Sequence, residues 1–451
     1  MFDHTQIPLD VFVAVFEIGT LTWGVRYLPP LCIVCRAWND IILSNPRLWG
    51  IVTVTKDSTG EDLETHIAKA KASPLTIFIR SPSQKKALQR AIGALIGLSH
   101  NWVSADVPVQ LLTRCRWPNL RGTLESLRLS GSSRISDSNV DAFFAPEQDQ
   151  STFSAPPRLR SLAVDGVHKA WITPLLSSSI TYLELNLRDS NIQTQQLSDT
   201  LDYLTRASEV VILKLNNVQH YSHSLASHHP VCLPKLLTLG VDRVLYPSTL
   251  LSQISAPSLQ TLTIRGQAEL LWKYLSQPEL NFLGPFFAQW SQGIFLPTQL
   301  HTLELVDCLQ VSDVALLIRW LARLPSLVRL ILIDDSIARA RELRSSSEET
   351  NILAALASPE GAGPVVGGWL CPMLMQFCFS TDFQVTDLIP LARARGGVAT
   401  PSLTTVIRPG RLRVIEAPLC PSGTTEDIRV LANLMDQVRC TCVECQFHRI
   451  L

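Results

Sequence analysis

The segment Leu300-His301-Thr302-Leu303-Glu304-Leu305 has leucine at its first, fourth and sixth positions. In a β-strand alternate side chains point to the same face, so the fourth and sixth residues enter one core. The leucine at the first position adds an apolar contact just before the strand. A single unit of this kind cannot bury its apolar face alone, so we expect similar units to stack against it.

The same spacing recurs along the chain when isoleucine, valine or phenylalanine is accepted in place of leucine. The other copies are Leu124-Leu127-Leu129, Leu159-Leu162-Val164, Ile180-Leu183-Leu185, Val210-Leu213-Leu215, Leu236-Leu239-Val241, Leu259-Leu262-Ile264, Leu327-Leu330-Leu332, Leu374-Phe377-Phe379 and a weaker Leu403-Val406. Their first positions lie 35, 21, 30, 26, 23, 41, 27, 47 and 29 residues apart. Five of these nine intervals match the length of a leucine-rich repeat, roughly 20–29 residues.

Turn residues follow several copies, as a strand that ends in a tight turn requires. They are Gly131, Gly166, Asn191, Gly266 and Asp307-Cys308. A leucine every third residue is also helical spacing, so one copy alone would be uninformative. Ten copies with turns favour an α/β fold, namely an irregular leucine-rich-repeat-like α/β solenoid.

The chain divides into three regions by its pattern. Residues 5–50 predict a small three-helix unit, residues 51–120 linking strand and helix units that lead into the array, and residues 121–451 the irregular solenoid. Two long intervals predict insertions near 266–299 and 344–369. The first contains Phe286, Phe287 and Trp290, and is either a degenerate repeat or an inserted helix.

Three helices are expected within residues 5–50. The first starts at Pro8, carries an apolar face and is expected to end at Gly19. Pro29-Pro30 open a second helix that continues through Trp38, because a first helical turn tolerates proline. A third covers 39–43 and stops before Asn45-Pro46, since a residue that precedes proline avoids the helical conformation.

Composition excludes several classes of protein. The 451 residues are 46% apolar and 17% charged, which favours a folded chain with a large core. Lys plus Arg and Asp plus Glu are 39 each, so no strong field for nucleic acid or an anionic membrane is expected. Eleven scattered cysteines and the lack of a signal-like N-terminus or a long apolar run predict reduced thiols in a cytoplasmic or nuclear protein.

The first fifty residues resemble the F-box. Ile7 to Phe16 resembles its opening, Ile33-Val34-Cys35-Arg36-Ala37-Trp38 its valine-cysteine-arginine-x-tryptophan element, and Asn45-Pro46-Arg47-Leu48-Trp49 its closing proline-x-leucine-tryptophan. The order and spacing of these three elements agree over about 43 residues. Asp10 in place of the usual glutamate, Pro29-Pro30 and a long 20–26 linker depart from the pattern. The stretch up to Ile77 also resembles F-box proteins of mushroom-forming fungi that carry leucine-rich-repeat-like regions.

This resemblance implies that the N-terminal unit binds the adaptor subunit of SCF-type cullin–RING ubiquitin ligases. The residues expected to contact the adaptor are apolar or aromatic with few exceptions: Pro8, Leu9, Val11, Phe12, Val15, Phe16, Leu31, Val34, Cys35, Trp38, Leu48 and Trp49. For Phe16 and Trp38 the alternative is that they only hold the three helices together. A unit of about 45 residues cannot bury all its aromatic side chains by itself, which favours a partner.

A target is expected on the concave side of the repeats, where the residues between the strand leucines point. These positions include Arg128, Glu184, Lys214, Asp242, Arg265, Glu304 and Arg329. Their mixed signs name no class of target, and they are equally consistent with a solvated face. The 266–299 segment is a second candidate for docking.

No motif for catalysis, a cofactor or nucleotide binding stands out. Gly361, Gly363, Gly367 and Gly368 lack the context of a phosphate loop. His220, His223, His228 and His229 fit no compact metal motif. Cys440, Cys442, Cys445 and His448 supply four soft ligands within nine residues, too compact for most structural zinc sites. We therefore expect no enzyme activity, no cofactor and no metal.

The sequence thus predicts a substrate-recognition subunit of an SCF-type ubiquitin ligase, with an F-box for the adaptor and repeats for a protein target. Neither nucleic acid nor a membrane is an expected partner. The alternative is a leucine-rich-repeat scaffold or regulator outside the ligase, with a vestigial F-box.

Overall fold

A computed structural model describes the chain as two compact units, residues 1–191 (unit 1) and 192–451 (unit 2), and each is treated by itself. The described residues are 8–24, 27–55, 57–80, 86–112, 122–131, 157–187, 196–218, 230–244, 247–266, 283–291, 299–309, 311–333, 352–358, 369–380, 385–396, 410–417 and 425–440.

Unit 1 begins with four helices, α1 (Leu9–Trp23), α2 (Leu28–Cys32), α3 (Arg36–Ser44) and α4 (Pro46–Trp49). An aromatic cluster joins α1 to α3. The ring centroids of Phe16 and Trp38 lie 5.3 Å apart, and the Phe12 ring lies 6.2 Å from Phe16 and 6.0 Å from Trp38. These edge-on and tilted contacts hold the helical unit together.

The helix boundaries correct two expectations. The first helix was expected to end at Gly19, but it continues to Trp23. A Cβ atom at Gly19 would overlap the Tyr27 ring, and the Thr20 hydroxyl donates to the Phe16 carbonyl at 2.7 Å, so both residues fit the helix. The expected second helix through Trp38 is interrupted after Cys32, because Cys35 is extended, with φ −159°.

The expected stop before Asn45-Pro46 is confirmed. Helix α3 ends at Ser44, and Asn45 is extended, with φ −108° and ψ 93°. The Asn45 side chain then accepts a hydrogen bond from the Arg47 N–H at 3.3 Å and caps α4. Pro46 occupies the first turn of α4, where its missing N–H costs nothing.

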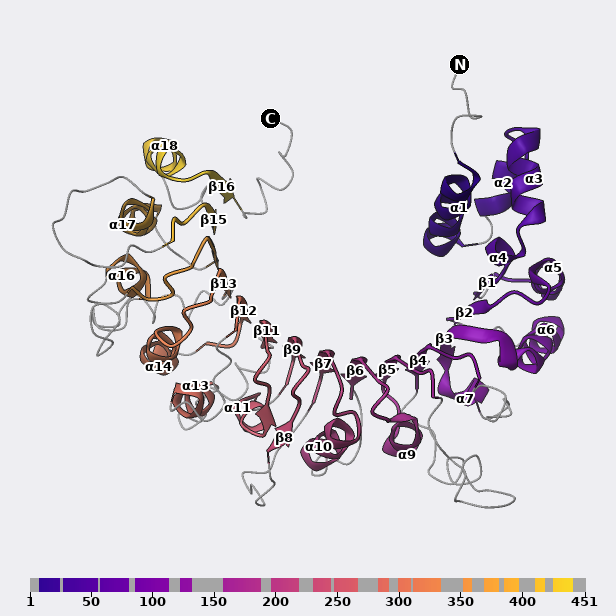
Figure 1. Cartoon of the computed structure of the whole chain (residues 1–451), viewed down its shortest axis with the longest axis horizontal. Helices are drawn as coiled ribbons and strands as arrows, with labels where there is room; N and C mark the ends of the chain where they lie inside the picture. Colours follow the sequence, from indigo (N-terminus) through magenta and orange to yellow (C-terminus); the bar gives the residue numbers. More distant parts are fainter. Residues whose placement is uncertain are drawn as a thin grey trace. The chain divides into compact units, whose positions relative to one another are not determined.

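Parallel strands in consecutive order form the rest of unit 1 (Figure 1). They are β1 (Ile51–Val54), β2 (Leu75–Ile79), β3 (Trp102–Pro108), β4 (Ser126–Ser130), β5 (Ser161–Asp165) and β6 (Tyr182–Asn186). Between them lie α5 (Gly60–Ala70), α6 (Lys86–Gly97), η3 (Ser99–Asn101), α7 (Val109–Leu112), α9 (Lys169–Ile172) and η6 (Thr173–Leu175). The parallel pairing therefore starts at β1, directly after the N-terminal helices.

Unit 2 repeats the same plan with β7 (Ile212–Asn216), β9 (Thr238–Asp242), β11 (Thr261–Arg265), β12 (Thr302–Val306), β13 (Arg329–Ile333), β14 (Gln376–Ser380), β15 (Val414–Ala417) and β16 (Gln437–Cys440). Each pairs in parallel with the next. A separate parallel pair joins β8 (Val231–Cys232) to β10 (Ile254–Ser255).

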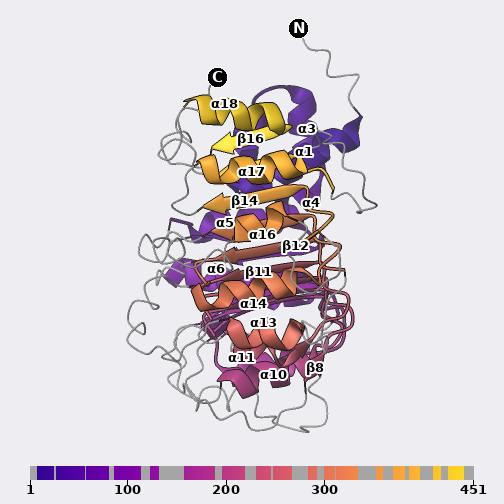
Figure 2. The ribbon, with the colours of Figure 1, turned by 90° about the vertical axis from the view of Figure 1, so that its left-hand side faces the viewer.

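The described helices of unit 2 lie on one face of its sheet (Figure 1). They are α10 (Gln196–Arg206), α11 (Pro247–Leu251), α13 (Gly284–Ser291), α14 (Val311–Leu321), α16 (Ile352–Ala357), α17 (Val385–Arg395) and α18 (Thr425–Leu434). Figure 2 shows α14, α16, α17 and α18 stacked one above another in chain order. The face of the strands away from the helices is called the open face below.

The expected α/β, leucine-rich-repeat-like solenoid fold is confirmed. Leu239, Leu262, Leu303, Leu330 and Phe377 lie side by side in register and are fully buried. In unit 1 the equivalent row contains Leu127, Leu162 and Leu183. Neighbouring units therefore complete one another's core, as the spacing predicts.

Gly131, Gly166, Gly266 and Asp307 directly follow strands, and the chain bends at Gly166 and Asp307, while Asn191 lies outside the described residues. The backbone N–H of each donates to the next repeat at 2.7–2.8 Å. Asp307 has a left-handed φ of 50°. At Gly266 an added Cβ would overlap the Asp307 carbonyl oxygen, so the close approach of two backbones requires glycine there.

Strands β1, β2, β3, β15 and β16 belong to the sheet but to none of the ten copies of the leucine pattern. Strand β3 fits it with Trp102, Ala105 and Val107, all buried, but tryptophan and alanine disguise the spacing. Near the C-terminus the buried set is Leu412, Ile415 and Ala417. The weak copy Leu403-Val406 lies outside the described residues, so the repeat next to β14 is the one at β15.

The described part of the 266–299 segment is the core helix α13, and β11 pairs directly with β12, so the described residues of this segment add a helix but no strand to the sheet. Phe286, Phe287 and Trp290 of α13 are buried, with rings 5.2–5.8 Å from Trp320 of α14. These aromatic side chains are therefore not available to a target. In the 344–369 segment only 352–358 and 369 are described, including the short helix α16.

Candidate partner-binding surfaces

Helix α1 exposes a stripe of large apolar side chains to solvent. The exposed fractions are 58% for Leu9, 48% for Val11, 50% for Val15, 64% for Ile18 and 54% for Leu21. The spacings of three and four place Val11, Val15 and Ile18 on one side of the helix. Opposite them, Phe16 faces the core at 1% exposure.

Other large apolar side chains of the N-terminal helices and their connections are also exposed. Trp23 is 67% exposed, Ile33 86%, Val34 58% and Leu43 51%. Of the large apolar side chains that are strongly exposed among the described residues, only Met373 lies outside the stretch from Leu9 to Leu43. Exposed apolar side chains gathered in one stretch are typical of binding surfaces. These residues, from Leu9 to Leu43, are called the N-terminal apolar surface.

Five of the expected adaptor contacts are exposed: Pro8, just before α1, and Leu9, Val11, Val15 and Val34 on this surface. Four more are half-buried, namely Phe12, Leu31, Cys35 and Trp38. Sequence reasoning missed Ile18, Leu21, Trp23, Ile33 and Leu43. It ended the first helix at Gly19, although the spacing from Val11 through Val15 to Ile18 continues the same stripe.

The structure corrects the other three. Phe16, Leu48 and Trp49 were expected to contact the adaptor, but their side chains are only 1%, 0% and 2% exposed. Side chains buried inside the chain cannot contact a partner directly, so this expectation is wrong for these three residues. Phe16 packs on Trp38, which fits the alternative that Phe16 and Trp38 hold the helices together. Leu48 and Trp49 lie on α4, which packs against α5 and β1.

Trp49 joins the N-terminal helices to the first repeat. Its indole N–H donates to the Ile42 carbonyl at 2.9 Å, so its polar atom is satisfied within the chain. The His66 ring lies 5.7 Å away and Lys69 Nζ lies 4.0 Å above the indole. Burial lowers the pKa of the His66 imidazole, opposed by Asp62 and assisted by Lys69.

In unit 1 the strand residues that alternate with the buried leucines also form an open face, and a hydrogen-bond network lies there around Glu184. Glu184 Oε2 accepts from Arg128 at 3.1 Å and from the Tyr182 hydroxyl at 2.6 Å. The Arg128 side chain reaches over the small Ala163, which lies between the two in register. Burial, and then the bond to Glu184, raise the pKa of Tyr182 to about 12.

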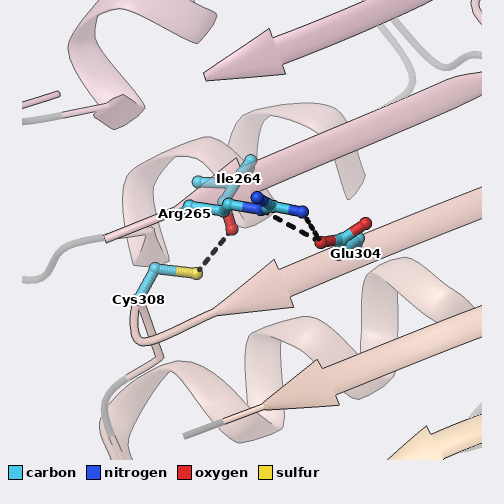
Figure 3. A network of polar contacts seen from close by, with 4 residues as sticks. All are labelled: Ile264, Arg265, Glu304 and Cys308. Carbon is cyan, nitrogen blue, oxygen red and sulfur yellow. Dashed lines mark hydrogen bonds and ion pairs between the residues drawn. The ribbon is translucent and has the colours of Figure 1, made fainter. Parts of the chain in front are cut away.

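In unit 2 the open face carries two ion pairs. Arg265 donates from both Nε and a terminal nitrogen to Glu304 Oε1, at 3.1 and 2.7 Å (Figure 3). On the leucine side of the same strands, the Cys308 thiol donates to the Ile264 carbonyl at 3.6 Å. Arg439 donates to Glu416 Oε1 at 2.9 Å.

The expected target-binding residues all belong to these strands. Lys214 and Asp242 lie on β7 and β9, and Arg329 begins β13, between Thr302 and Gln376 in register. Arg128 with Glu184, and Arg265 with Glu304, are brought together as ion pairs. The sequence alternation placed these residues on one face but did not indicate which of them pair.

Other candidates fall partly or wholly outside the described residues. Of the cysteine and histidine set near the C-terminus only Cys440 is described, and Cys442, Cys445 and His448 are not. The histidines from His220 to His229 and the glycines from Gly361 to Gly368 are not described either. Within the part of the chain that is described, no cluster of three potential metal ligands occurs, and no helix is long and apolar enough to cross a membrane.

Comparisons with known proteins give distant likenesses only. No protein family and no curated protein matches the sequence. A crystal structure of a TLR13-ssRNA13 complex is similar with a TM-score of 0.40 and 14% identity, over 81% of this chain and 42% of that one. The crystal structure of the Rad7 and Elc1 complex in yeast is similar with a TM-score of 0.36 and 14% identity, over 94% and 96%. Likenesses this distant carry no information on what this chain binds.

Proposed function

We propose that the chain is a non-catalytic substrate-recognition subunit of an SCF-type ubiquitin ligase. The N-terminal apolar surface binds the adaptor subunit, and the open face of the repeats binds a protein target. The observation that best supports this proposal is the exposure of large apolar side chains between Leu9 and Leu43, inside the stretch that resembles an F-box.

The physical argument is that one apolar side of α1 remains exposed to solvent. Helix α1 is apolar on both sides, yet only the side with Phe16 packs within unit 1. Val15 and Ile18 remain half or more exposed, a state that a partner helix would relieve. The repeats, by contrast, bury their leucines among themselves and need no partner for their core.

The test is binding of the purified chain to the recombinant adaptor subunit of an SCF ligase. Val15→Glu and Ile18→Glu place a charge on the apolar surface without disturbing a buried side chain. We expect each to weaken adaptor binding at least about tenfold, as for a central interface residue. Met373→Glu is the matched control, because Met373 is 54% exposed but lies in unit 2.

Two outcomes would reject this assignment. A wild-type chain that is folded but does not bind the adaptor would favour the alternative of a scaffold or regulator with a vestigial F-box. Adaptor binding that survives Val15→Glu combined with Ile18→Glu would show that α1 is not the contact.

A further inference from the structure

Arg329 lies on β13, near the middle of the unit 2 open face. Among the described residues, no side chain forms a hydrogen bond or ion pair with it. It lies at the start of β13, and the next open-face residue on that strand is Ile331. Ile331 lies between Glu304 on β12 and Cys378 on β14, and Cys378 is followed in register by Glu416 and Arg439. Five strands thus contribute to one row of this face, in the order Glu304, Ile331, Cys378, Glu416 and Arg439, while Arg265 and Arg329 lie two residues away along their strands.

The two carboxylates of this row are already paired. Glu304 accepts two hydrogen bonds from Arg265, and Glu416 accepts one from Arg439. The Nε atom of Arg329 is buried and has no hydrogen-bond acceptor in the described part of the chain. A buried donor without an acceptor is costly, so an acceptor supplied by a bound molecule would be favoured here.

The surroundings of Arg329 are poorly solvated. Ile331 and Cys378 are each 6% exposed, although they lie on the open face. Burial raises the pKa of the Cys378 thiol to about 11, with Glu416 contributing and Arg329 opposing. In such surroundings a charge-assisted hydrogen bond is stronger than on a fully hydrated surface.

Charge balance selects the kind of ligand. Arg265, Arg329 and Arg439 face Glu304 and Glu416, which leaves a formal charge of +1. The next two charged positions, Lys214 and Asp242, cancel each other and do not change this value. A carboxylate would neutralise this set of five charged side chains, whereas a phosphate carries about −1.5 to −2 and would leave the set negative beside two glutamates.

We propose that Arg329 is the anchor of the target site and binds an aspartate or glutamate side chain of the target protein, with the Arg265–Glu304 and Arg439–Glu416 pairs at its two sides. This inference rests on the proposed function and names the chemistry of the target. The guanidinium suits the role because its planar donors match a carboxylate.

The test is selection of peptides from a random display library on the full chain, followed by binding measurements with the selected peptides. We expect enriched sequences to share an aspartate or glutamate at one position. Arg329→Gln should weaken their binding about 30-fold, as expected when one partner of a desolvated charge pair is removed. Arg319→Gln, on an exposed arginine of α14, is the matched control and should leave binding unchanged.

A second measurement does not depend on the folding of the variant. A selected peptide in which its acidic residue is replaced by glutamine or asparagine should bind the wild-type chain about 30-fold more weakly. A library without acidic enrichment, or peptides bound equally by wild type and Arg329→Gln, would overturn the assignment. A phosphoserine peptide that binds more tightly than its glutamate counterpart would overturn the choice of a carboxylate.

These results are separable from the test of the proposed function. Arg329→Gln should bind the adaptor as the wild type does, because Arg329 lies in unit 2 and the N-terminal apolar surface in unit 1. Adaptor binding without acidic peptide selection rejects the Arg329 site alone. Failure of adaptor binding rejects the proposed function itself.

Discussion

Helices α1 and α14 are both rich in apolar residues, yet only α14 buries them. In α14 the side chains of Leu317, Trp320 and Leu321 are fully buried against the repeats. In α1, Val15 and Ile18 remain 50% and 64% exposed. Apolar periodicity therefore identifies a helix that needs a partner surface, but not whether that surface belongs to the same chain.

The two helices differ because of what stands next to them. The repeat helices lie over parallel strands with buried leucines, and α13, α14, α16, α17 and α18 also pack on one another in chain order. Among the described elements helix α1 packs mainly on α3 and α4, on its Phe16 side, and Tyr27 lies against Gly19. The uncovered side of α1 is thus a property of the fold, and the following predictions test it.

The largest contrast is expected between Leu317→Glu and Ile18→Glu. Leu317 is 0% exposed, so its replacement buries an unpaired charge and should unfold unit 2 or cost most of a stability of about 5–15 kcal/mol. Ile18→Glu should change the free energy of unfolding by less than about 0.5 kcal/mol. Urea unfolding followed by circular dichroism measures both. A comparable loss from both variants would mean that Ile18 packs inside the chain.

Trp49 and Trp23 give the same contrast for tryptophan. Trp49→Ala should cost about 3–5 kcal/mol, because a buried indole and its bond to the Ile42 carbonyl are lost. Trp23→Ala, at 67% exposure, should have little effect on stability. Thermal unfolding of the two variants is the measurement. Near-wild-type stability of Trp49→Ala would contradict its role as the joint between α4 and α5.

The fold and the candidate surfaces differ in how far the sequence predicts them. Leucine spacing predicts the repeats because each strand must bury alternate residues, and it fails at Trp102-Ala105-Val107, where the core volume is filled by other residues. Alternation also places Arg265 and Glu304 on the open face correctly. It could not distinguish Trp49, which packs on its own chain, from Val15, which does not. That distinction depends on where α5 lies, and local sequence does not contain it.

A second buried contact, at Arg395, tests whether polar groups inside the repeats are as important as the leucines. Its guanidinium donates to the carbonyls of Leu356 at 2.8 Å, Cys371 at 3.0 Å and Leu370, and burial lowers its pKa to about 10. Arg395→Met leaves three carbonyls without this donor and should cost about 3 kcal/mol. Arg393→Met, on an exposed position of the same helix, is the control for urea unfolding. Equal stability of both variants would mean that the hydrogen bonds from Arg395 to the three carbonyls do not stabilise unit 2.

The smallest expected effect is the pH dependence that His66 gives to the joint at Trp49. Burial holds the pKa of His66 below its ordinary 6.5, so the folded chain binds fewer protons at this site than the unfolded chain. The free energy of unfolding should therefore be constant well above pH 6.5 and decrease as the pH falls from that value towards the lowered pKa. His66→Gln should remove this part of the decrease, whereas His100→Gln, on an exposed histidine, should retain it. Unfolding curves from about pH 8 to about pH 5 measure the difference. A wild-type chain and His66→Gln with parallel pH profiles would mean that the imidazole is solvated, and that Trp49 alone joins α4 to α5.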